Sequence, residues 1–148
     1  MFQDATDELE GLPPELMTTR EVLSVRALIY HQTGEWQLLR EVGGYLVHHW
    51  PGESQHWIWV AYGTRRCHSI AEAERFLVDA LKLHDSEPMI HFNLACYAAQ
   101  TGDLVAARVR LARAIDLNPT FRKMAMGDPD LEPLWAELGN SDTTPGHD

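Results

Sequence analysis

Apolar and small residues recur at helical spacing in two consecutive stretches of residues 88–121, which is the pattern of two helices that each bury one face. A polar turn ending in Gly102-Asp103 separates the two stretches. Glycine tolerates the left-handed backbone that ends many helices, so Gly102 is predicted to terminate the first helix. Asp103 is predicted to cap the second helix by accepting hydrogen bonds from its first N–H groups. Pro119 stops the second helix, because the residue before a proline is pushed out of the helical region.

The same pattern recurs with a period of 34 residues towards the N-terminus. The turn positions Gly34, His68 and Gly102 are equally spaced, as are the helix-ending positions Pro51, Asp85 and Pro119. Three repeats are therefore predicted at residues 20–53, 54–87 and 88–121, and they form six antiparallel helices in three hairpins. Ser69 and Glu72 have the spacing of a capping box at the start of a helix. The first repeat departs most from the pattern, because Gly43 and Gly44 lie inside a predicted helix, where each glycine costs about 1 kcal/mol relative to alanine.

The period and the residues at fixed offsets resemble tetratricopeptide repeats. Small residues stand where that family packs two antiparallel helices closely. In the third repeat the matching residues are Leu94, Ala95, Gly102, Ala107, Leu111, Ala114 and Pro119, and in the second they are Trp57, Ala61, Ala73, Leu77 and Ala80. The resemblance implies an all-α fold, an α-solenoid of three tetratricopeptide hairpins with a C-terminal capping helix. The alternative is an unrelated helical bundle with coincidental spacing.

The ends of the chain differ from the repeats. Residues 1–19 are polar and acidic, and we expect a disordered lead-in there, with Thr18 or Thr19 as the cap of the first helix. Residues 122–140 are expected to form the capping region, with a last helix over residues 131–138 that has Asp130 as its N-cap and tolerates Pro133 in its first turn. This helix is expected to present Leu131, Leu134, Trp135 and Leu138 on one face. Residues 141–148 are expected to be a disordered tail. The phrase Asp-Pro-Asp-Leu-Glu-Pro-Leu-Trp resembles the ending of a group of small bacterial tetratricopeptide proteins with no clear assigned activity.

The net charge of −10 argues against general nucleic-acid binding, which needs basic residues to displace counterions from phosphates, and against adhesion to anionic membranes. No run of about 18 apolar residues that would span a bilayer occurs in the sequence, and the N-terminus does not read as a secretory signal. Two cysteines without metal-type spacing favour a reduced, cytoplasmic protein.

The sequence predicts no enzyme, no cofactor and no metal site. The eight histidines lack the paired spacing of a helical zinc site, and His48 and His49 are adjacent, so they point to different faces. Cys67 follows Arg65 and Arg66, a setting that favours a thiolate, but a catalytic thiol also needs a base. The simpler interpretation makes Cys67 and Cys96 small core or groove residues.

In tetratricopeptide arrays the first helices of the hairpins line a concave groove, and the resemblance implies which side chains face it here. The predicted partner-binding residues are Leu28, Ile58, Tyr62, Arg65, Arg66, Met89 and Phe92. They combine an apolar strip with two arginines at one end, which suits a peptide with apolar anchors and an acidic group. The alternative is that the last helix or an N-terminal segment covers this strip as ordinary core.

The sequence therefore predicts a protein–protein interaction module, an adaptor that binds a segment of a partner protein. A secretion-type cytoplasmic chaperone for an exported protein is the second candidate, and a histidine-based metal site is the third. The identity of the partner and the oligomeric state are left open by the sequence.

Overall fold

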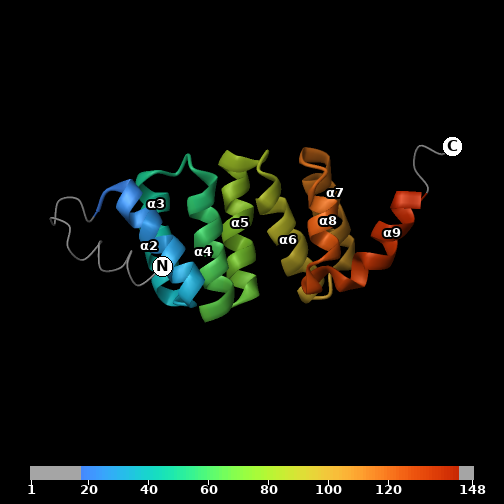
Figure 1. The fold of residues 1–148 in the computed structure, drawn as a ribbon, viewed down its shortest axis with the longest axis horizontal. Helices are drawn as coiled ribbons and strands as arrows, with labels where there is room; N and C mark the ends of the chain where they lie inside the picture. The colour runs from blue at the N-terminus through green and yellow to red at the C-terminus, as the bar shows by residue number, and fades with distance from the viewer. Residues whose placement is uncertain (1–17, 144–148) are drawn as a thin grey trace. The chain divides into compact units, whose positions relative to one another are not determined.

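A computed structural model describes residues 18–143 of the chain. Contacts divide it into two compact units, residues 1–83 and residues 84–148, and each is described below by itself. The described part of the chain is helical and contains no strand (Figure 1), which confirms the all-α fold class. Most of the predicted lead-in, residues 1–17, and the end of the predicted tail, residues 144–148, lie outside the described residues.

Unit 1 contains a first hairpin of α2 (Arg20–Thr33) and α3 (Trp36–His49), followed by α4 (Ser54–Cys67) and nearly all of α5 (Ile70–His84). The predicted caps are present: the Thr19 side chain accepts from the Val22 N–H, and the Ser69 hydroxyl accepts from the Glu72 N–H at 3.1 Å. Gly34 ends α2 with a φ of 75°, in the left-handed region that glycine reaches without strain. A core forms around Leu23, Ala27, Leu39, Leu46 and Trp59.

The packing of α3 on α4 explains why glycine stands at two positions of this unit, Gly43 on α3 and Gly63 on α4. A Cβ atom at Gly43 would lie 2.9 Å from the Val60 side chain, and a Cβ atom at Gly63 would lie 2.6 Å from the Trp36 carbonyl oxygen. The two helices therefore approach too closely for a side chain at either position. Gly44, by contrast, has nothing within 4 Å of the corresponding point. The glycine that departs from the repeat pattern at position 43 is thus a packing requirement.

Unit 2 contains a hairpin of α6 (Pro88–Gln100) and α7 (Leu104–Leu117), followed by α8 (Phe121–Met126), the 3-10 helix η2 (Pro129–Leu134) and α9 (Trp135–Thr143). Gly102 has a φ of 90°, and Asp103 accepts from the Ala106 N–H at 3.0 Å. Both turn predictions are confirmed. Ala95, Ala107 and Ala114 are fully buried where α6 and α7 meet.

The C-terminal segment differs from the predicted α-helix over residues 131–138. A 3-10 helix forms first, capped by Asp128, whose carboxylate accepts from the Asp130 N–H at 2.9 Å. The difference has a local cause: Asp128, and not the predicted Asp130, is the cap residue, and its carboxylate places Asp130 inside the first turn. The α-helix begins only at Trp135 and continues to Thr143, into the predicted tail.

The internal repeat is visible in equivalent hydrogen bonds. In unit 1, the Trp57 indole N–H donates to the Pro51 carbonyl oxygen at 2.8 Å. In unit 2, His91 stands one period later, and its Nε2 lies 2.8 Å from the Asp85 carbonyl oxygen, so the tautomer that carries the Nε2 proton donates there. In both units a buried ring, on α4 in unit 1 and on α6 in unit 2, fixes the loop that precedes its helix.

Candidate functional site

A cluster of three rings and one guanidinium lies on unit 1, and we call it the Arg66 cluster. It contains His31 near the end of α2, Trp36 at the start of α3, and Tyr62 and Arg66 on α4. The ring centroids of His31 and Tyr62 are 4.5 Å apart, and that of Trp36 lies 5.9 Å from Tyr62. The Arg66 guanidinium carbon lies 3.9 Å from the Tyr62 ring centroid and 4.9 Å from that of Trp36. Both are within the range of cation–π attraction.

The guanidinium is held in place while most of its donors stay available. Arg66 Nη1 donates to the Tyr62 backbone carbonyl at 3.2 Å, and the side chain is exposed. A guanidinium has five N–H donors in a fixed plane. Among residues 18–143, no carboxylate pairs with Arg66. The cluster therefore presents an oriented cation on an aromatic base, in a protein with a net charge of −10.

The pKa of His31 depends on its surroundings in the Arg66 cluster. Burial lowers the pKa of the His31 imidazole from its ordinary value, and the neighbouring Arg66 charge lowers it further. Both effects disfavour the imidazolium, so the ring is neutral near pH 7. A neutral imidazole leaves the positive charge of the cluster on Arg66.

The other sequence-predicted residues of unit 1 differ in accessibility. Leu28 lies one turn before His31 on α2, and 52 % of it is exposed. Ile58 is only 8 % exposed, so it belongs to the interior of the unit rather than to an open surface. Arg65 is half-buried and is engaged elsewhere in the protein. The accessible members of the predicted set are therefore Leu28, Tyr62 and Arg66.

In unit 2 the predicted residues face the protein's own C-terminal segment. Phe92 is 4 % exposed, and its ring centroid lies 5.4 Å from that of Phe121. It shares one core with residues of α8, η2 and α9, and Met89 packs against this core. The Cys96 thiol donates to Asp128 Oδ2 at 3.7 Å, and the Gln100 amide donates to the Asp130 carbonyl at 3.4 Å. Phe92 is thus a core residue, because η2 lies against α6.

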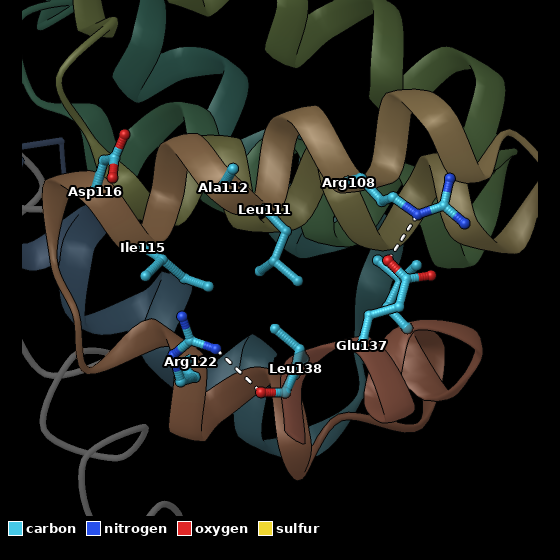
Figure 2. Close-up of a pocket in the computed structure, with 9 residues that line it drawn as sticks. Arg108, Leu111, Ala112, Ile115, Asp116, Arg122, Glu137 and Leu138 are labelled. Atoms are coloured by element: carbon cyan, nitrogen blue, oxygen red, sulfur yellow. Dashed lines mark hydrogen bonds and ion pairs between the residues drawn. The ribbon is translucent and has the colours of Figure 1, made fainter. Parts of the chain in front are cut away.

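A cavity of about 240 Å³ opens on unit 2 between α7 and the C-terminal helices (Figure 2). Its apolar wall comes from Leu111, Ile115, Leu134 and Leu138. Arg108 Nε donates to Glu137 Oε1 at 2.7 Å at one end, and Arg122 Nη1 donates to the Leu138 carbonyl at 3.2 Å near the other. The hydrogen bond with Glu137 raises the pKa of Arg108, and the same bond lowers the pKa of Glu137. The guanidinium groups of Arg108 and Arg122 are thus both hydrogen-bonded within unit 2.

The described residues contain one group of side chains with metal-ligand spacing. Potential ligand atoms of Cys96, Asp128 and Asp130 lie within 4.8 Å of one another. These residues are also hydrogen-bonded to one another, since Asp128 accepts both from the Cys96 thiol and from the Asp130 N–H. Cys67, on the other unit, donates to Gln37 Oε1 at 3.2 Å. The hydrogen bonds give both cysteines structural roles.

Comparison with solved structures identifies similar folds. The chain is similar to PcrH from Pseudomonas aeruginosa, with a TM-score of 0.60 at 20 % identity over 88 % of this chain and 91 % of that one. It is equally similar to PcrH in complex with the chaperone binding region of PopD, with the same TM-score, identity and coverage. PcrH in complex with the chaperone binding region of PopB gives a TM-score of 0.59 at 20 % identity over 88 % of this chain and 97 % of that one.

This likeness, at low identity, shows a shared helical-repeat fold. No protein-family model matches the sequence, and no curated protein matches it either. Within residues 18–143, no helix is long and apolar enough to cross a lipid bilayer.

Proposed function

We propose that this chain is a tetratricopeptide-type module that binds an extended segment of a partner protein, and that unit 1 carries the binding through Leu28, Tyr62 and Arg66. The observation that supports this most is Arg66, which is exposed, oriented by stacking on Tyr62 and Trp36, and without a described carboxylate partner. Aromatic and arginine residues supply much of the energy of typical interfaces. Leu28, which is exposed on α2 one helical turn before His31 of the cluster, offers an apolar side chain.

The partner segment combines apolar anchors with a carboxylate. Arginine binds carboxylates through two parallel hydrogen bonds, and such charge-assisted bonds are about twice as strong as neutral ones. Of the remaining residues of the predicted set, Ile58 lies in the interior of unit 1, Met89 and Phe92 belong to the core of unit 2, and Arg65 adds positive charge next to Arg66. In this proposal the chain acts in the cytoplasm as an adaptor without enzymatic activity.

A chaperone for an exported protein is the second candidate. It is favoured by the fold shared with PcrH, which has been solved with the chaperone binding regions of PopB and PopD. The Asp-Pro-Asp-Leu-Glu-Pro-Leu-Trp ending fits a small bacterial tetratricopeptide protein in either role. Co-purification of an apolar export substrate would favour the chaperone, whereas a cytoplasmic partner that stays in the cell would favour the adaptor.

The test selects peptides from a display library of short random sequences on the purified full-length chain. Selected peptides are expected to contain Asp or Glu beside leucine-like residues. Arg66→Gln is expected to weaken binding and to flatten its dependence on salt, because screening acts on the lost charge pair. Tyr62→Ala is expected to weaken binding as well. Arg110→Ala, on α7, serves as the control. Peptides that bind all variants equally, with folding intact, would place the interface elsewhere.

A further inference from the structure

The Arg66 cluster places a guanidinium that has no carboxylate partner among the described residues on an acidic molecule. One donor of Arg66 is used by the Tyr62 carbonyl at 3.2 Å, and no carboxylate among the described residues takes the others. A carboxylate placed in the plane of the guanidinium would be bound by two hydrogen bonds. Leu28 on the preceding turn of α2 offers an exposed apolar neighbour. A segment in which acidic residues and leucines alternate would therefore match both features.

Such a segment is present in the chain itself. Residues 1–17 lie outside the described residues, and their sequence contains five carboxylates and no Lys or Arg. Acidic and leucine residues alternate in its middle, which reads Asp-Glu-Leu-Glu-Gly-Leu over residues 7–12. The charge of this segment is complementary to Arg66, and its leucines are suited to Leu28.

The segment is also long enough. It joins the described chain at Thr18, just before α2, and His31 lies 11 residues after Arg20 along that helix. At a rise of about 1.5 Å per residue, this part of α2 spans roughly 17 Å. Glu10 is 8 residues before Thr18, and at about 3.1 Å per residue in an extended chain these residues span roughly 25 Å. Pro13-Pro14 favours such an extended backbone. The chain from Thr18 back to Glu10 is therefore long enough to match the distance along α2 to His31, whereas the three residues back to Glu15 are too few.

We propose that the N-terminal segment, residues 1–17, binds the Arg66 cluster of the same molecule and competes there with the partner segment. The proposal rests on the proposed function for its regulatory meaning, since the competitor is the partner described above. A tethered segment faces its site at an effective concentration in the millimolar range. Even a weak self-contact therefore occupies the site until a tighter ligand displaces it.

The test uses the full-length chain without any partner and follows the His31 ring by NMR titration. A carboxylate beside the cluster stabilises the imidazolium. Neutralising the acidic residues up to Glu10 with Asp4→Asn, Asp7→Asn, Glu8→Gln and Glu10→Gln is therefore expected to lower the measured His31 pKa. Asp116→Asn with Glu132→Gln, two exposed acidic residues of unit 2, is the control and should leave the His31 titration unchanged.

A second readout locates the segment directly. A nitroxide spin label is attached at Ala5→Cys in a Cys67→Ser background, where the buried Cys96 does not react. Loss of the His31 and Tyr62 ring signals, and their recovery on Arg66→Gln, is expected. An unchanged His31 titration together with unbroadened ring signals would overturn the proposal. So would broadening that appears only in mixtures of labelled and unlabelled molecules, because a second copy would then supply the segment. None of these outcomes depends on peptide selection, so the two proposals can fail separately.

Discussion

The close contact of α3 and α4 makes a sharp prediction about three glycines in unit 1. Replacing Gly63 by alanine places a Cβ atom 2.6 Å from the Trp36 carbonyl oxygen and 3.0 Å from the Arg40 nitrogen. Both atoms belong to the backbone, so no side-chain rotation relieves the clash and the helices must separate. Overpacking of this kind costs about 1–3 kcal/mol, and a backbone obstacle favours the upper end of that range. Alanine in a helix returns about 1 kcal/mol relative to glycine. We expect Gly63→Ala to lower the free energy of unfolding by about 2 kcal/mol.

Gly43 and Gly44 supply the comparison, because they are adjacent on α3 and differ in surroundings. A Cβ atom at Gly43 meets the Val60 side chain at 2.9 Å and the Val60 nitrogen at 3.1 Å, whereas one at Gly44 meets nothing within 4 Å. Gly44→Ala is therefore expected to stabilise the protein by about 0.5–1 kcal/mol through helix propensity alone. The stability of Gly43→Ala is expected to lie between those of Gly63→Ala and Gly44→Ala, since part of its clash is with a movable methyl group of Val60.

Urea unfolding followed by tryptophan fluorescence measures these differences. Trp36, Trp50, Trp57 and Trp59 lie in unit 1 and only Trp135 lies in unit 2, so the signal reports mainly on the unit that carries the glycines. With a slope of about 2 kcal/mol per molar urea, the loss expected for Gly63→Ala lowers the midpoint by about 1 M. If Gly63→Ala proved as stable as Gly44→Ala, the α3–α4 approach described above would be refuted.

Three further predictions concern packing, the C-terminal segment and His31. Ala95→Leu and Ala107→Leu, at fully buried positions between α6 and α7, should each destabilise the fold by about 1–3 kcal/mol in denaturation followed by circular dichroism; parent-like melting would contradict the repeat alignment. Removal of residues 128–148 should expose Phe92 and Leu111 and cause aggregation detectable by light scattering, whereas a stable monomer would show that the segment does not cover the hairpin. The His31 ring should titrate below 6.5, and Arg66→Gln should raise its pKa while burial still keeps it below that value. Because its folded pKa is depressed, His31 contributes stability that is lost as pH falls from 6.5 through its folded pKa; titration at or above 6.5 in the parent would contradict this.

The fold was predictable because its determinants are local and periodic. Gly102, Asp103 and the buried Ala95 and Ala107 occupy fixed offsets in a repeat, and the turn and helix–helix contacts follow from those offsets. The 3-10 helix was not predictable from apolar spacing alone. The stripe of Leu131, Leu134 and Trp135 fits an α-helix capped at Asp130, but Asp128 caps the segment and the 3-10 helix η2 forms instead.

The candidate site was predictable only in part. The repeat alignment placed Tyr62 and Arg66 on the first helix of a hairpin, but it gave no signal for Trp36, which begins a second helix and joins the cluster from α3. The same alignment assigned Phe92 to the groove, although η2 covers that side of α6. A repeat pattern fixes which way a side chain points from its own helix. It cannot tell which later segment of the chain will lie against that side chain.

The equivalent helices α4 and α6 thus differ in what contacts them, and this difference is relevant to function. On α6 the Cys96 thiol donates to Asp128 and the Gln100 amide donates to the Asp130 carbonyl, so that surface is already occupied by the chain itself. On α4 the corresponding end carries Arg66, whose charge is stacked on rings instead of being paired with a described acidic group. A ligand on α6 must first displace hydrogen bonds that the chain makes with itself, whereas Arg66 is open to water and can form a bidentate pair with an incoming carboxylate. We therefore expect binding at the Arg66 cluster, by a ligand that carries a carboxylate.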